Sequence, residues 1–207
     1  MNYYNIEEIL RRVEVLRPEA VIDFPFFLTL VMAAGYGVLH RLIVKEKSIF
    51  HLAFWVSFIF YGLNVVRLTF FPLPLNDEYN ALVAILIDQG AVYCCRNNLQ
   101  LLDFMKWDNL WYWTTIGNFF LLFPLGIYLP ILMKKGNLLK ITLAGFLVSL
   151  GIEMVQYLLG LYTGYVVRSF DVDDLMLNTL GAVSAYLLFT TGRLFFRAFQ
   201  KLRRRLV

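Results

Sequence analysis

The chain has 207 residues, of which 59% are hydrophobic and 16% are charged, and its net charge is +4. Soluble domains average about 45–50% apolar and about 25% charged residues, so the composition excludes a disordered chain and an ordinary soluble domain. The two adjacent cysteines, Cys94 and Cys95, cannot form a disulfide framework. The small positive excess does not indicate a nucleic-acid partner. The composition therefore indicates an integral membrane protein.

Residues 1–20 are predicted to form an amphipathic helix. Apolar residues recur there at helical spacing, and charged residues lie between them. The apolar positions are Ile6, Ile9, Leu10, Val13 and Leu16. Pro18 is expected to end the helix, because proline removes a backbone donor. A helix with this pattern is expected to lie on the membrane surface.

Residues 21–192 are predicted to form an all-α, polytopic transmembrane helix bundle. A membrane-spanning helix needs roughly 20 mostly apolar residues, and five stretches qualify. They are about 21–44, 48–66, 110–133, 141–161 and 175–192. The longest connection, 72–109, contains an apolar segment at 81–95, which predicts an interfacial or re-entrant helix, with a sixth span as the alternative. Pro124 predicts a kink in the third span.

The distribution of basic residues predicts the orientation. An excess of Lys and Arg marks cytoplasmic loops. If five spans are threaded alternately, twelve of the 19 Lys and Arg residues lie on the side of the C-terminus and seven lie on the other side. The C-terminus is therefore predicted to be cytoplasmic and the N-terminus extracellular. The basic tail, 193–207, fits either attraction to anionic lipid head groups or a simple topology anchor.

Polar side chains of four spans are predicted to meet near the outer leaflet. Such residues are costly inside a membrane, so they tend to be paired or functional. Glu153 and Gln156 are three residues apart, and Asp171, Asp174 and Asn178 follow an i, i+3, i+7 pattern on one helix face. The small residue that continues this stripe, Gly181, permits close helix packing. The candidate ligand-binding residues are Arg67, Asn118, Glu153, Gln156, Arg168, Asp171, Asp174 and Asn178.

These residue types suit an anionic ligand, chemistry on that ligand, or both. Arginine binds phosphate or carboxylate through two parallel hydrogen bonds, so Arg67 and Arg168 are candidates to hold an anion. Glu153 and Asp174 are candidate proton acceptors if the site is catalytic. Structural alternatives stay open. Glu153 could pair with an arginine to fix helix packing, and Asp171 with Asp174 could cap a helix.

Other polar and aromatic residues have simpler interpretations. Asp173 lies off the polar stripe and is expected to face solvent. An aromatic belt at the membrane interface explains the group Trp107, Trp111, Tyr112 and Trp113. Neither His40 nor His51 has a second ligand at metal-binding spacing, and no nucleotide-binding fingerprint is present. Neither a metal nor a cofactor is predicted.

Four segments together resemble the VanZ-like family of small integral membrane proteins. They are Arg67-Leu68-Thr69-Phe70-Phe71-Pro72, then Asn118 with Phe123-Pro124-Leu125-Gly126, then Glu153-x-x-Gln156, and finally Arg168-x-x-Asp171-x-x-Asp174-x-x-x-Asn178-Thr179-x-Gly181. The resemblance covers about Arg67–Gly181. It implies a bacterial cell-envelope protein that lowers susceptibility to teicoplanin, a glycopeptide antibiotic.

Three functions are compatible with these observations. The favoured one is a non-enzymatic protein whose outer-leaflet polar pocket engages an anionic lipid head group, such as that of a cell-wall lipid precursor. The first alternative is a membrane-embedded enzyme that acts on a lipid head group. The second is a small lipid transporter, which is disfavoured because the inner halves of the spans carry few polar side chains.

Overall fold

The computed structural model describes residues 6–45, 47–92, 96–102, 105, 112–133, 136–164 and 167–206, and this part of the chain is almost entirely helical. Its only sheet pairs two strands of two residues each. Five described segments are long and apolar enough to cross a membrane. They are Phe26–Ile43, Ile49–Phe70, Trp113–Leu132, Leu138–Thr163 and Val172–Arg204. The predicted all-α class with about five spans is confirmed.

The chain divides into two compact units, and each is described by itself. Unit 1 comprises Met1–Asn97 and Met154–Phe170. Unit 2 comprises Asn98–Glu153 and Asp171–Val207. The boundary passes through one continuous helix, α8 (Leu138–Thr163), whose two ends belong to different units.

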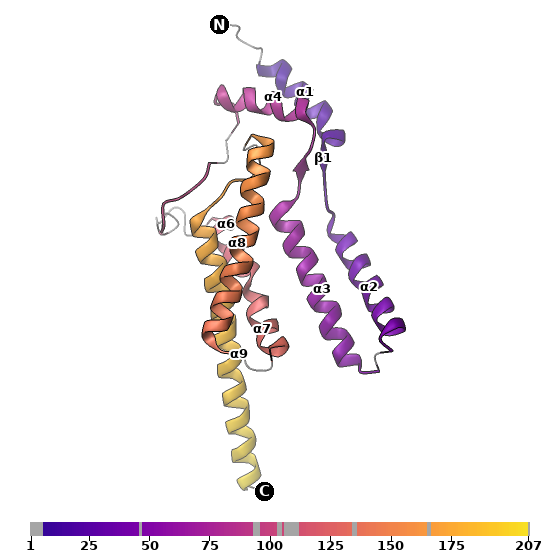
Figure 1. Cartoon of the computed structure of the whole chain (residues 1–207), viewed down its shortest axis with the longest axis vertical. Helices are drawn as coiled ribbons and strands as arrows, with labels where there is room; N and C mark the ends of the chain where they lie inside the picture. The colour runs from indigo at the N-terminus through magenta and orange to yellow at the C-terminus, as the bar shows by residue number, and fades with distance from the viewer. Residues whose placement is uncertain are drawn as a thin grey trace. The chain divides into compact units, whose positions relative to one another are not determined.

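Unit 1 contains two helix pairs, of which one is long and apolar (Figure 1). Its elements are α1 (Ile6–Ala20), β1 (Val21–Ile22), α2 (Phe26–Ile43), α3 (Ile49–Phe70), β2 (Leu73–Pro74) and α4 (Asp77–Asp88). Helix α1 packs against α4, with an ion pair between Arg12 and Glu78, while α2 packs against α3. The antiparallel strands β1 and β2 connect the two helix pairs.

Two details of unit 1 differ from the sequence predictions. Helix α1 continues past Pro18 to Ala20, because the backbone angle that proline imposes is itself helical. Helix α4 begins at Asp77, earlier than predicted, because the Asn76 side chain caps it by accepting from the Tyr79 N–H (2.9 Å). With 12 residues, α4 is too short to span a bilayer. Cys94 and Cys95 lie outside the described residues.

Unit 2 contains four described helical segments. Its elements are α6 (Trp113–Leu121), α7 (Phe123–Leu132), the first part of α8, and α9 (Val172–Leu206). The predicted kink is confirmed: Leu122 leaves the helical conformation between α6 and α7, and Pro124 lies in the first turn of α7. Proline cannot donate the hydrogen bond that would continue α6.

Small residues set the packing within unit 2. A Cβ atom at Gly181 would collide with the backbone carbonyl of Phe119, and one at Gly126 would collide with that of Ala182. The expected role of Gly181 in close helix packing is therefore confirmed. Helix α9 runs well beyond Gly192, because the residues that follow are mostly good helix formers without Pro or Gly.

The predicted aromatic belt is only partly described. Tyr112 and Trp113, at the start of α6, are exposed, as side chains at a lipid interface would be. Trp107 and Trp111 lie outside the described residues.

Candidate functional site

The predicted site residues fall into two groups, each within one unit. The first group, called here the arginine centre, consists of Arg67, Gln156 and Arg168 in unit 1. The second, called the carboxylate centre, consists of Asn118, Glu153, Asp171, Asp174 and Asn178 in unit 2.

Arg168 binds backbone carbonyl groups at the end of α3. Its Nε donates to the oxygen of Thr69 (2.7 Å), and its Nη2 donates to that of Phe71 (2.8 Å). Its Nη1 donates to the oxygen of Val167 (3.0 Å). The last carbonyls of a helix have no partner within the helix and carry partial negative charge, so a guanidinium group is well placed there. Arg168 therefore fixes the end of α3 to the segment that follows α8.

Gln156 reinforces the same connection. Its side-chain Nε2 donates to the oxygen of Thr69 (3.0 Å), so this one carbonyl accepts from both Gln156 and Arg168. The Thr69 hydroxyl, which is buried, donates instead to the oxygen of Val65 (2.8 Å). The end of α3 is thus held by two side chains from the distant segment 154–170.

Arg67 lies one turn before the end of α3 in a different environment. Its Nε donates to the Oδ1 atom of Asn64 (3.3 Å), and its guanidinium carbon lies 5.6 Å from the ring centroid of Phe26. Asn64 in turn donates to the hydroxyl of Thr29 on α2 (3.2 Å). Among the described residues, no acceptor contacts the two terminal nitrogens of Arg67, and the side chain is half-buried.

Asp171 caps α9 in the carboxylate centre. Its Oδ1 accepts from the backbone N–H of Asp173 (2.8 Å) and from the side chain of Asn98 (2.9 Å). This is the N-cap arrangement that the sequence left open as an alternative. Burial raises the pKa of the Asp171 carboxyl, and these two hydrogen bonds oppose that shift.

Glu153 is 1% exposed and approaches the start of α9. Its Oε2 atom accepts from the backbone N–H of Asp171 (2.9 Å). The first backbone N–H groups of a helix carry partial positive charge, which suits a carboxylate partner. Glu153 therefore connects α8 to the α9 N-terminus within unit 2.

Two amides complete the carboxylate centre. The side chain of Asn118 on α6 forms a hydrogen bond with the Asp174 carboxyl group. The Nδ2 atom of Asn178 donates to the hydroxyl of Ser149 on α8 (3.0 Å), and both residues are buried. The Oδ1 atom of Asn178 is buried and has no hydrogen-bond partner among the described residues. The predicted stripe thus contacts both α6 and α8.

The solvent-facing position predicted for Asp173 is wrong. Asp173 is 3% exposed, and its Oδ1 accepts from the backbone N–H of Leu102 (2.7 Å). The segment 98–102 folds over the start of α9, where the Val172 N–H also donates to the oxygen of Asn98 (3.0 Å). A loop far away in sequence buries this residue, and the helical phase of Asp173 contains no information about that loop.

Several contributors to the two centres were not predicted. Asn98 and Ser149 hold Asp171 and Asn178. The three-residue spacing of Asn64 and Arg67, by contrast, places both on one helix face in the sequence, and Asn64 orients Arg67 in the structure. The partners of Arg168 are backbone carbonyls, which every residue possesses, so sequence gives no signal for them.

The chemistry that each centre can support differs. The arginine centre offers donors to an anion. The carboxylate centre offers acceptors and exchangeable protons next to amides. Within the described ranges, no cluster of three or more His, Cys, Asp or Glu side chains has the geometry of a metal site.

Comparison with known protein families shows which family the chain belongs to. The profile of the VanZ/LLP1 family matches residues 49–196. The chain belongs to the VanZ/LLP1 family. The matched range contains both centres, and the family together with the five apolar segments indicates a multi-pass membrane protein. Comparison of this VanZ/LLP1 chain with curated proteins and with solved structures gives no match.

Proposed function

We propose that this VanZ/LLP1 protein binds the anionic head group of a cell-envelope lipid through Arg67 and thereby lowers susceptibility to glycopeptides such as teicoplanin. The observation that supports the proposal best is the set of contacts that Arg67 makes. Asn64 and Phe26 orient its guanidinium group, while the two terminal nitrogens lack a described acceptor. Two parallel N–H donors match the oxygens of a phosphate or carboxylate.

Arg168 has a supporting role in this proposal. Its donors already bind carbonyl oxygens, so it holds the end of α3 and adds positive charge beside the anion. Gln156 shares the Thr69 carbonyl and stabilises the same end. The count of basic residues on the two sides of the membrane predicts that this end of α3 lies near the outer leaflet, which supports the proposal. Envelope precursors carry their head groups there after export, within reach of a glycopeptide.

Lipid binding tests the first half of the proposal. Full-length protein would be purified in mild detergent, and co-purified lipids would be quantified by mass spectrometry for wild type, Arg67→Gln and Arg41→Gln. Arg41 is exposed near the end of α2 and controls for the loss of one charge. Anionic lipid should fall about tenfold in Arg67→Gln, as expected when a charge-assisted bidentate contact is lost. Equal retention in both variants would contradict the proposal.

Susceptibility tests the second half. A teicoplanin-sensitive Gram-positive host would carry empty vector, wild type, Arg67→Gln or Arg41→Gln at matched membrane levels. Wild type and Arg41→Gln should raise the inhibitory concentration, and Arg67→Gln should not. Protection by every variant would show that Arg67 is not required, and protection by none would remove the antibiotic role while leaving lipid binding to be judged separately.

The carboxylate centre favours one alternative function, chemistry on a lipid head group. Here Glu153 or Asp174 would accept a proton. The Oδ1 atom of the buried Asn178, which has no hydrogen-bond partner among the described residues, would accept a hydrogen bond from substrate. The test is product formation from candidate phospholipids, with and without Mg²⁺, by wild type, Asp174→Asn and Asp88→Asn. Asp88 is an exposed residue of α4 and serves as the control. Turnover that only Asp174→Asn abolishes would support an enzyme, and absence of any product would exclude one for those lipids.

A further inference from the structure

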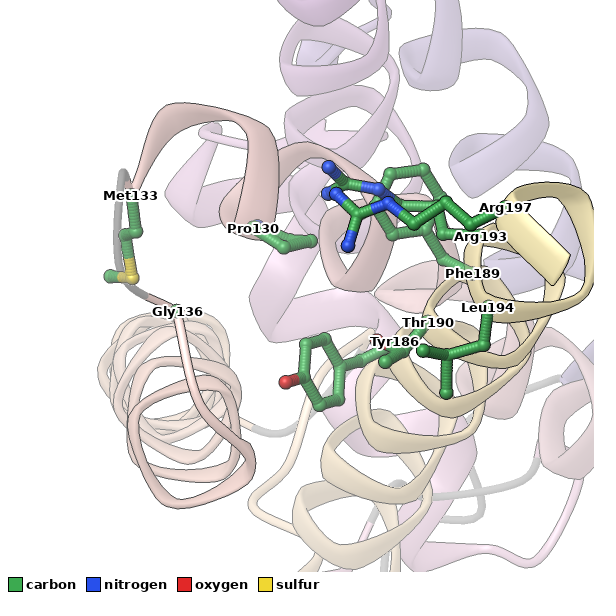
Figure 2. Close-up of a pocket in the computed structure, with 9 residues that line it drawn as sticks. All are labelled: Pro130, Met133, Gly136, Tyr186, Phe189, Thr190, Arg193, Leu194 and Arg197. Atoms are coloured by element: carbon green, nitrogen blue, oxygen red, sulfur yellow. The ribbon is translucent and has the colours of Figure 1, made fainter. Parts of the chain in front are cut away.

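A cavity of about 200 Å³ lies in unit 2 between the end of α7 and the second half of α9. Figure 2 shows the residues that line it. From α7 and the turn after it come Pro130, Met133 and Gly136, and from α9 come Tyr186, Phe189, Thr190, Arg193, Leu194 and Arg197. The cavity exists because α7 ends at Leu132 while α9 continues to Leu206, so α7 does not cover this stretch of α9.

The polar groups of the cavity share one helix face. Tyr186, Thr190, Arg193 and Arg197 follow each other at spacings of three or four residues on α9. Both arginine side chains extend from α9 toward Pro130 (Figure 2). The guanidinium carbon of Arg193 lies 5.3 Å from the ring centroid of Phe189, which orients this group through a cation–π contact.

Among the described residues, no acidic side chain pairs with either arginine. Two like charges at i and i+4 on a helix repel each other. Within the described residues neither Arg193 nor Arg197 forms an ion pair. The described acidic residues of unit 2 are Glu153 and the three aspartates at the start of α9, and none of them lines the cavity. An anion in the cavity would therefore relieve the repulsion and satisfy both arginines.

The position of the cavity along α9 matches a membrane boundary. Arg193 follows Asp174 by 19 positions, which is about 28 Å of helix at 1.5 Å per residue. The hydrocarbon core of a bilayer is about 30 Å thick. The arginines thus lie one membrane thickness away from the carboxylate centre, at the level of the opposite head groups. The Lys and Arg distribution assigns that side to the cytoplasm.

We infer that this cavity binds the phosphate group of an anionic ligand, with Arg193 and Arg197 as the anion-binding pair and Thr190 and Tyr186 as hydroxyl donors. Basic pockets between transmembrane helices on the cytoplasmic side bind anionic lipid head groups. A lipid such as phosphatidylglycerol and free inorganic phosphate offer the same chemistry. The apolar lining residues, Phe189 and Leu194, also suit the glycerol and upper acyl chain of a lipid.

A matched pair of double variants tests the inference. Affinity of the full-length protein for phosphatidylglycerol would be measured by native mass spectrometry for wild type, Arg193→Gln/Arg197→Gln and Arg203→Gln/Arg204→Gln. Both variants remove two charges from α9, so both lose the same general attraction to anionic lipid. The first should bind about tenfold more weakly than the second, because it also loses charge-assisted hydrogen bonds. Equal affinity in the two double variants would overturn the inference.

A second pair of variants keeps the charge constant. Thr190→Leu fills the cavity, whereas Thr191→Leu adds the same side chain at an adjacent exposed position outside it. Affinity should fall several-fold in Thr190→Leu and stay unchanged in Thr191→Leu, with both variants checked for folding by size-exclusion chromatography. Unchanged affinity in the folded Thr190→Leu protein would overturn the assignment of the cavity.

A competition experiment distinguishes a lipid phosphate from free inorganic phosphate as the ligand. If inorganic phosphate at millimolar concentration displaces phosphatidylglycerol from wild type, the site takes free phosphate. If it does not, and phosphatidylcholine binds more weakly than phosphatidylglycerol, the ligand is an anionic lipid. Equal binding of the zwitterionic phosphatidylcholine and the anionic phosphatidylglycerol, with no effect of inorganic phosphate, would contradict a site for an anionic ligand.

Discussion

Asn178 shows how a single polar side chain is retained inside an apolar unit. It is 1% exposed, and its amide nitrogen donates to the hydroxyl of Ser149 across the contact between α8 and α9. A polar side chain without this partner would carry the cost of dehydration. The contact therefore fixes which face of α9 meets α8.

A double-mutant cycle measures this contact. Ser149→Ala and Asn178→Ala should each destabilise the protein. Their coupling energy should be about 0.6 kcal/mol, the average for hydrogen bonds between membrane helices, and no more than about 1.7 kcal/mol. The measurement is unfolding in detergent by a denaturing surfactant, followed by circular dichroism. Strictly additive effects of the two substitutions would show that the hydrogen bond contributes nothing to stability.

The titration of Asp171 is expected to make the stability of the protein depend on pH. Burial raises its pKa in the folded state above the value of about 3.9 expected in the unfolded chain. The folded state therefore binds this proton more tightly, and the contribution of Asp171 to stability falls as pH rises from below 4 through the raised pKa. Asn caps helices as well as Asp does, so Asp171→Asn keeps the cap and removes the titration.

The test compares the pH dependence of stability in wild type and in Asp171→Asn. Thermal unfolding of wild type and of Asp171→Asn would be measured from pH 3 to pH 8. The variant should gain stability relative to wild type as pH rises. A constant difference across the range would contradict the raised pKa of Asp171.

At the scale of elements, glycine positions on α9 decide how closely the helices of unit 2 pack. A methyl group at Gly181 would collide with a backbone carbonyl of α6, which cannot move aside as a side chain could. Nothing lies within 4 Å of a methyl group at Gly192 on the same helix. The effect of a glycine-to-alanine substitution can therefore be compared between these two positions of α9.

Gly181→Ala should be destabilising and Gly192→Ala should not. The first should cost about 1–3 kcal/mol through overpacking. The second should be neutral or gain up to about 1 kcal/mol, because alanine favours a helix more than glycine does. Fluorescence-detected size-exclusion chromatography after heating gives the apparent Tm of each. Similar melting of the two variants would contradict the close approach of α6 and α9.

Sequence periodicity predicted those parts of the two centres that lie on helices. The i, i+3, i+7 spacing placed Asp171, Asp174 and Asn178 on one face, and the structure gives that face its partners on α6 and α8. Periodicity could not predict contacts made by loops or by backbone atoms. The burial of Asp173 depends on the segment 98–102, and Arg168 binds carbonyls about a hundred positions away in sequence.

At the scale of the whole molecule, orientation in the membrane follows from charge and from the number of spans. Five spans and the positive-inside rule predict that the two ends of the chain lie on opposite sides, with the basic end in the cytoplasm. Reporter fusions at each end test this prediction. A reporter active only in the cytoplasm should work at the C-terminus and fail at the N-terminus, and a reporter active only outside should do the opposite. Identical behaviour at the two ends would require an even number of spans.

Helix α9 also has a consequence for the bilayer that surrounds it. Asp174 and Arg193 belong to one unbroken helix, and neither charge is stable in hydrocarbon, so the distance between them defines a fixed hydrophobic length of about 28 Å. In membranes of longer-chain lipids this length falls short, and the surrounding lipid must thin or the arginine side chains must stretch toward the interface. In thinner membranes the helix must tilt. A change in lipid chain length would then alter, through hydrophobic mismatch, the position of Asp174 and of Arg193 relative to the membrane interfaces at the same time.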